Sequence, residues 1–246
     1  SHSEVILSLK IAILGGTGTL GGGLALRWSA HHEIAIGSRD SEKGKRLAEE
    51  YRQEVKERHD GYERIQGGEN TEAIRDSDVI VPALPYVFIP QMAKMIEPVV
   101  KSHAIILSPI VPMEKKGDHF IYVDQELSMQ ENTKGSAAEL IAQYLPQTRI
   151  VVALNTIPAI MLSKFDRQLD YDVFMAGDDQ EAVQVIADLL KEIPGLNPVY
   201  AGPLPVARQI EGLVPLLLNL SRHGKMKAPS FKVISTNIKE EVQYGG

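Results

Sequence analysis

The sequence predicts an α/β fold with a doubly wound, mainly parallel sheet and a small helical segment at the C-terminus. Two observations support this prediction. Short apolar runs alternate along the chain with segments of helical periodicity, and a glycine-rich turn directly follows the first apolar run. Continuous apolar strands are typical of parallel sheets, because helices cover both faces of such a sheet.

The apolar runs that predict strands in the first part of the chain lie at 9–14, 33–37, 63–67, 78–84, 103–108 and 149–154. A strand, a helix and another strand are then expected at 171–177, 180–193 and 198–202. Because each strand is followed by a segment long enough for a crossover, neighbouring strands can run in the same direction.

Periodic apolar residues predict the crossover helices. Leu20, Leu24 and Trp28 recur every fourth residue and would present one apolar stripe to the sheet. A second helix is expected from Asp40 or Ser41, either of which can cap its start. A third helix follows Ser136, which forms a capping box with the glutamate three residues later.

Composition and charge exclude several classes of function. The 246 residues carry a net charge of -6 without a dense run of Lys and Arg, which argues against binding to nucleic acid. The chain has no cysteine, so disulfides, cysteine zinc sites and thiol nucleophiles are excluded. The longest apolar run, 213–220, is too short to span a bilayer. We therefore expect a cytoplasmic protein with neither a nucleic-acid nor a membrane partner.

The glycine-rich turn fits the pattern G-x-G-x-x-G at Gly16, Gly18 and Gly21, between a predicted strand and a predicted helix. Gly16 would allow the tight turn, Gly18 would let the backbone approach a diphosphate, and Gly21 would let the helix pack closely on the strand. The helix start offers free N–H groups and the positive end of a dipole to that diphosphate. The pattern predicts a Rossmann-like dinucleotide-binding domain.

The end of the second strand favours NADP over NAD. Sites that prefer NAD usually place a carboxylate there, whereas this chain has Ser38 and Arg39, with Lys43 one helical turn later. Arg39 can make paired, charge-assisted hydrogen bonds to a 2′-phosphate, and Lys43 adds a second cation. Asp40 would repel that phosphate, but its position is also that of a helix cap.

Three segments at predicted strand ends contain proline: 82–86, 107–112 and 154–159. In a doubly wound sheet they should border one crevice, where proline can form a stiff, apolar wall for a flat ring. For any one of them, a proline that simply ends a strand is the simpler interpretation. Together, Pro85, Pro109 and Pro158 favour a pocket for a second ring.

The chemistry expected in this crevice is hydride transfer. The chain has no Y-x-x-x-K proton relay, no G-x-S-x-G nucleophile and no histidine pair suited to a metal. Hydride transfer between two rings requires mainly that the protein stack them and exclude water. The alternatives are an NADPH-dependent reductase of a flavin or of a small imine or keto substrate, and a non-catalytic NADP sensor.

The sequence resembles the F420H2:NADP oxidoreductases, which pass hydride between the deazaflavin coenzyme F420 and NADP. The resemblance rests, in order from about residue 9 to 222, on "KIAILGGTGTLGGGLALR", "HEIAIGSRD", "SPIVP", "GSAAE", "NTIPA", "GDD" and "AGPLPVARQIEGLVPLLLNL". It implies that Thr17, Thr19 and Leu20 line the diphosphate and ribose, that Ser38, Arg39 and Lys43 hold the 2′-phosphate, and that Leu84, Pro85, Ser108 and Asn155 surround the stacked rings.

Three features depart from the family pattern. Asn155 stands where some members have histidine, although an amide can still bond to a carboxamide or a pyrimidine edge. The short turn before the second strand lacks glycine, so we expect a positive φ at His31. Residues 122–134 look like an insertion beside the deazaflavin site.

The expected organisation is an NADP-binding, Rossmann-like domain over 1–202 and a helical segment over 203–246 that completes the site. The apolar run 213–220 predicts either a helix buried in the monomer or a dimer interface, and Pro215 would kink that helix. The resemblance implies a homodimer formed through the C-terminal helices.

Overall fold

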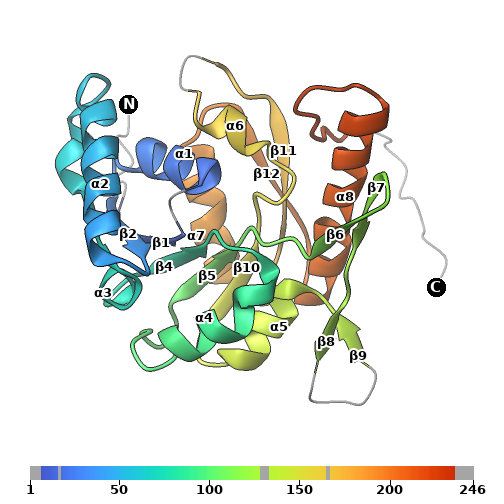
Figure 1. The fold of residues 1–246 in the computed structure, drawn as a ribbon, viewed down its shortest axis with the longest axis horizontal. Helices are drawn as coiled ribbons and strands as arrows, with labels where there is room; N and C mark the ends of the chain where they lie inside the picture. Colours follow the sequence, from blue (N-terminus) through green and yellow to red (C-terminus); the bar gives the residue numbers. More distant parts are fainter. Residues whose placement is uncertain (1–6, 16–17, 128–132, 165–166, 236–246) are drawn as a thin grey trace.

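The computed structural model describes residues 7–15, 18–127, 133–164 and 167–235, which are organised around an eight-stranded sheet (Figure 1). The strand order is β12-β11-β10-β5-β4-β1-β2-β3. These strands are β1 (Lys10–Leu14), β2 (Glu33–Ser38), β3 (Ile65–Glu69), β4 (Val79–Pro82), β5 (Ile105–Ser108), β10 (Arg149–Val152), β11 (Tyr171–Ala176) and β12 (Leu196–Gly202). The expected α/β class is confirmed.

The strand order reverses between β1 and β4, which defines the place where a ligand can enter. From β1 the chain builds outward through β2 and β3, then returns to the other side of β1 with β4, β5 and β10, all of them parallel. Crevices at such reversals open at the carboxyl ends of the strands. β11 runs antiparallel to β10, which it meets at one register pair, Val152 with Ala176, and β12 is parallel to β11.

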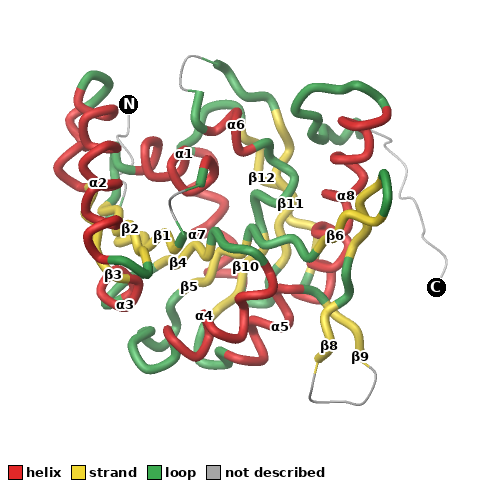
Figure 2. The backbone as a smooth tube through the Cα atoms, in the orientation of Figure 1, coloured by secondary structure: helices red, strands yellow, loops and turns green. Residues whose placement is uncertain are grey.

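Helices cover both faces of the sheet (Figure 2). One apolar core lies under α1 (Thr19–Trp28), α2 (Ser41–Lys56), α6 (Ala159–Leu162) and α7 (Gln180–Lys191). The opposite core lies under α3 (Asn70–Ile74), α4 (Ile89–Ile96), α5 (Ala137–Tyr144) and the start of α8 (Ala207–His223). Short 3-10 turns occur at η1 (Asp60–Arg64), η2 (Tyr86–Phe88) and η3 (Leu204–Val206). Among the described residues, no helix is both long and apolar enough to cross a membrane.

Two of the predicted helix caps are present. The Asp40 carboxylate accepts hydrogen bonds from the amides of Glu42 and Lys43 at the start of α2. Ser136 caps α5 in a complete capping box with Glu139. Each cap gives a partner to amides that the first turn of a helix leaves unpaired, and each contributes about 1 kcal/mol.

The expected positive φ at His31 is wrong. The turn after α1 closes instead through the amides of His31 and His32, which both donate to the Trp28 carbonyl. The His32 ring is buried, accepts a hydrogen bond from the Leu9 amide at Nδ1 and places Nε2 3.0 Å from the Glu192 carboxylate. Tertiary contacts of this side chain hold the turn, so no left-handed residue is needed.

The hairpins β6–β7 and β8–β9 connect the sheet to the C-terminal helix. The first pairs Met113–Lys116 with His119–Tyr122, and the second pairs Gln125–Leu127 with Thr133–Gly135. The Asn219 side chain of α8 exchanges two hydrogen bonds with the backbone of Phe120 on β7. The segment expected as an insertion, 122–134, therefore contains β8, while its residues 128–132 lie outside the described part.

A buried carboxylate anchors α8, which continues through Pro215. Glu211 is 0% exposed and accepts hydrogen bonds from the Tyr122 hydroxyl (2.7 Å) and from the amides of Ala137 (3.0 Å) and Ala138 (3.1 Å) at the start of α5. Burial raises the pKa of the Glu211 carboxyl to about 7, against the opposing effect of these three hydrogen bonds. α8 is thereby tied to both α5 and β7.

We expect the free energy of unfolding to fall as the pH rises from about 4.5 to about 7. In this window folded Glu211 retains a proton that the unfolded chain releases, so the folded state is stabilised most below pH 4.5. The neutral variant Glu211→Gln should remove about 1–3 kcal/mol of this pH dependence. Urea denaturation of both proteins across the window measures the difference, and parallel curves would contradict the assignment.

Candidate functional site

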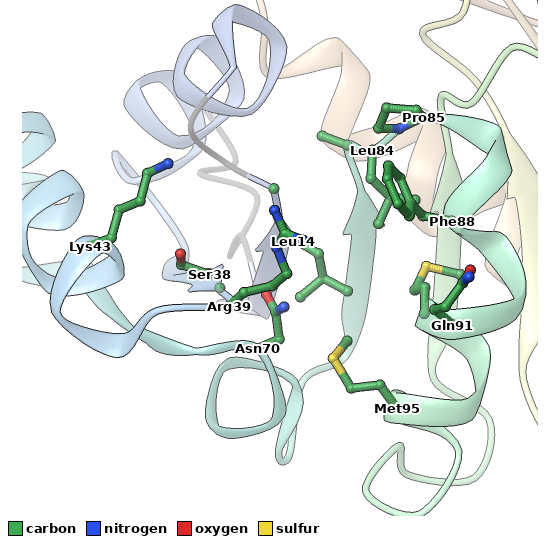
Figure 3. A pocket seen from close by; sticks show the side chains of 14 residues that line it. Leu14, Ser38, Arg39, Lys43, Asn70, Leu84, Pro85, Phe88, Gln91 and Met95 are labelled. Atoms are coloured by element: carbon green, nitrogen blue, oxygen red, sulfur yellow. The ribbon is translucent and has the colours of Figure 1, made fainter.

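A cavity of about 550 Å³ opens where the strand order reverses (Figure 3). Its walls come from the ends of β1, β2 and β4, from the start of α2 and from α4. The lining residues are Leu14, Gly15, Gly37, Ser38, Arg39, Lys43, Asn70, Ala83, Leu84, Pro85, Phe88, Gln91, Met92 and Met95. Five of the residues singled out in the sequence therefore meet here: Ser38, Arg39, Lys43, Leu84 and Pro85.

One end of the cavity is cationic. Ser38 is the buried last residue of β2, and the exposed side chains of Arg39 and Lys43 follow it (Figure 3). No carboxylate is among the lining residues that the structure describes. Asp40 does not line the cavity, because its carboxylate caps α2. This end can bind an anion such as a phosphate.

The other end is mainly apolar, with Gln91 as its polar side chain. Leu84 and Pro85 follow β4, and α4 adds Met92 and Met95 beside Phe88 (Figure 3). Such surfaces accept the face of a flat ring while excluding water. The predictions from the sequence omitted these residues of α4, although an amphipathic helix directly after the "PALPY" segment could have indicated them.

Asn70 is a further residue that the sequence predictions missed. It is the buried first residue of α3, and its Oδ1 has no hydrogen-bond partner in the described structure. A Cβ at Gly37 would lie 2.7 Å from this oxygen, so Asn70 sits against β2 only because residue 37 is glycine. The one signal in the sequence is a polar residue directly after the third strand.

The glycine-rich segment lines the cavity at Gly15. Gly16 and Thr17 are outside the described residues, so their predicted roles remain predictions. Gly18 is the N-cap of α1, and a Cβ added to it would meet no atom of the described residues within 4 Å, so these residues leave room for a ligand there. Thr19, Leu20 and Gly21 form the first turn of α1 and do not line the cavity.

Gly15, which the sequence predictions passed over, makes the tight turn among the described residues of this segment. Its φ is +68°, and a Cβ there would lie 2.6 Å from the Ala83 carbonyl oxygen. Both facts require glycine. The turn can therefore pass directly over the end of β4.

Ser108, Pro109 and Asn155 form a second group that does not line this cavity. Ser108 ends β5 opposite Val152 of β10, and Asn155 follows β10 closely. The Asn155 amide donates to the Ile110 carbonyl at 3.2 Å, while its Oδ1 and the Ser108 hydroxyl have no partner in the described structure. Leu154, just before Asn155, has a φ of +69°, a strained conformation for leucine.

The buried, unpartnered side-chain oxygens of the described residues all lie near the carboxyl ends of strands. They belong to Asn70 after β3, Ser108 on β5 and Asn155 after β10. Leaving such a group without a hydrogen bond costs about 1–3 kcal/mol. A ligand with polar edges along this side of the sheet would supply the missing partners. Within the described residues, no cluster of three or more potential metal ligands is found.

Comparison with known proteins agrees with this geometry. Residues 10–112 match the model of a family described as "NADP oxidoreductase coenzyme F420-dependent". The F420-dependent NADP reductase of Methanocaldococcus jannaschii is 33% identical over 231 residues, which are 94% of this chain and 100% of that protein. The F420-dependent NADP reductase of Methanothermobacter thermautotrophicus is 32% identical over 241 residues, 96% of this chain and 98% of that protein.

A crystal structure from Arthrobacter sp. FB24 superimposes with a TM-score of 0.70 at 23% identity, covering 93% of this chain and all of that one, and supports the fold. Both of these reductases align over at least 94% of this chain. The protein therefore belongs to the family of F420-dependent NADP reductases.

Proposed function

We propose that the protein transfers a hydride between NADP(H) and coenzyme F420. The observation that carries this proposal is the cavity at the strand reversal, which is cationic and free of described carboxylates at the β2 end and apolar at the β4 end. The identity of the second ring is taken from the relatives, because both are F420-dependent NADP reductases.

In this proposal the cationic end holds the 2′-phosphate of NADP. Arg39 donates paired hydrogen bonds, Lys43 adds charge, and the Ser38 hydroxyl donates a further bond. The diphosphate lies over Gly16, Thr17 and Gly18, and the amides of Thr19, Leu20 and Gly21 at the start of α1 point toward it. The open space at the Gly18 Cβ position supports this placement.

The nicotinamide and the deazaflavin stack between the apolar wall at Leu84 and Pro85 and the group formed by Ser108, Pro109 and Asn155. NADP and F420 themselves supply the hydride donor and acceptor. The protein orients the two rings, excludes water and offers the free oxygens of Ser108 and Asn155 to their polar edges. No side chain needs to act as acid or base in this step.

The proposal extends to the organisation of the molecule. Residues 1–202 form the NADP-binding domain, and 203–246 complete the site and form a homodimer through α8. Leu216 supports the dimer, because it is 48% exposed although it lies on the same helix as buried Val214 and Leu217. The cysteine-free composition fits a reaction in the cytoplasm.

Mixing the protein with NADPH and oxidised F420 should bleach the deazaflavin absorbance. NADH in place of NADPH should give a much slower reaction, because it lacks the 2′-phosphate. FMN in place of F420 is the control for the flavin alternative. Reduction of FMN without reduction of F420 would overturn the choice of substrate.

The variant Arg39→Asp should weaken NADPH binding about 10- to 150-fold, since a hydrogen bond to a charged group is worth about 1.5–3 kcal/mol. Its effect on NADH should stay within a few-fold. Lys45→Asp is the matched control: it makes the same change of charge nearby, in the first turns of α2, but its ammonium pairs with Glu42 and does not line the cavity. Titration of dihydronicotinamide fluorescence measures both affinities, and equal losses for NADPH and NADH would refute the assignment.

The mass in solution should be twice the chain mass of 27.1 kDa. Leu216→Glu would place a charge in the proposed interface and should shift the protein to a monomer in sedimentation velocity. Tyr144→Glu, a similarly exposed position on α5, should leave the dimer intact. A dimer that tolerates Leu216→Glu would exclude this face of α8 as the interface.

A further inference from the structure

A second cavity, of about 820 Å³, lies between α6 and the segment that follows α8. Four cationic side chains line it: Lys164 and Arg167 from the α6 side, and Lys225 and Lys227 from the segment after α8. Met161 and Met226 add apolar surface, and no carboxylate is among the described lining residues. We call this hollow the cationic cleft.

The charges of the cationic cleft are not neutralised within the described part of the chain. None of the ion pairs found there involves these four residues. Elsewhere exposed lysines do pair, as Lys191 does with Asp188 and Lys101 with Asp78. In a chain with a net charge of -6, four unneutralised cations around one hollow create a local positive potential that attracts anions.

The wall that carries Lys225 and Lys227 has a defined shape. Lys225 and Ala228 adopt positive φ angles of 54° and 48°, which are uncommon for residues other than glycine. The Ser221 hydroxyl holds this turn by donating to the Met226 carbonyl at 2.9 Å. Strained backbone of this kind persists only where surrounding contacts impose it.

The cationic cleft adjoins the region proposed for the second ring. The Ser230 hydroxyl donates to the carbonyl of Thr156 at 2.8 Å, directly beside Asn155. The loop with Asn155 leads through Pro158 into α6, which forms the opposite wall. In Figure 2, α6 and the loop after α8 lie on either side of β11, whose first residue, Tyr171, also lines the cleft.

We propose that the cationic cleft binds the anionic tail of the deazaflavin substrate, an inference that rests on the function proposed above. The ribityl chain of F420 continues into a phosphodiester and then into glutamate carboxylates, so the tail carries several negative charges. Arg39 and Lys43 lie at the β2 end of the first cavity and serve the phosphate of NADP. Arg167 can bind a phosphate through two donors, while the three lysines can pair with carboxylates.

Two deazaflavins test this assignment: F420 and FO, which has the same ring and ribityl chain but no phosphate or glutamate. Titration of deazaflavin fluorescence gives the dissociation constant of each without requiring hydride transfer. The wild-type protein should bind F420 at least about tenfold more tightly than FO, and added salt should reduce this preference. Lys225→Gln/Lys227→Gln should remove most of this preference, a loss of about 5- to 10-fold, by weakening F420 much more than FO.

Lys164→Gln, on the opposite wall, tests the same assignment if the double variant fails to fold. Lys56→Gln/Lys191→Gln is the matched control, because it removes two exposed charges that do not line the cationic cleft. The tail site would be overturned if the wild-type protein bound F420 and FO with equal affinity, or if the cleft variants lost equal affinity for both. Either result would leave the proposed function intact. Failure of the wild-type protein to bind either deazaflavin would overturn the proposed function itself.

Discussion

The geometry of the crevice depends on the close approach of residue 15 to the end of β4. A side chain at this position would meet the Ala83 carbonyl oxygen at 2.6 Å, and the φ of +68° excludes most residues other than glycine. Because the turn can pass here, α1 begins beside the point where the strand order reverses. In the binding mode proposed above, the amides at the helix start and the apolar wall after β4 hold parts of the same dinucleotide.

A second constraint concerns charge. The chain has a net charge of -6, yet no carboxylate is among the described lining residues of either cavity. Lysine and arginine side chains line both cavities. Asp40 is an example: it is next to Arg39 in the chain, but its carboxylate accepts hydrogen bonds from two backbone amides of α2. Glu211 is handled differently: it is fully buried and holds the starts of α5 and α8 together through hydrogen bonds.

The sequence alone was sufficient for the strands of the main sheet, for α1, α2, α5 and α7, and for the cationic end of the site, but not for α3, α4, α6 or the two hairpins. Strands of continuous apolar residues and caps such as Asp40 are local signals, and Ser38, Arg39 and Lys43 are close in the chain. Asn70 and Met95 have only weak local signals in the sequence, because they reach the cavity through tertiary packing. The glycine pattern assigned the tight turn to Gly16 and did not single out Gly15, because the role of Gly15 depends on contact with the end of β4. His31 was misjudged for the same reason, since distant contacts of His32 stabilise its turn.

The junction between β10 and β11 has a consequence for how the molecule is divided. One register pair joins these strands, so β11, β12 and α7 are attached to the nucleotide half mainly by apolar packing rather than by a main-chain ladder. Packing tolerates small rigid shifts and compensating substitutions more readily than a hydrogen-bond register does. Small rigid shifts of β11, β12 and α7 against the parallel strands would therefore disturb only one register pair of the described sheet.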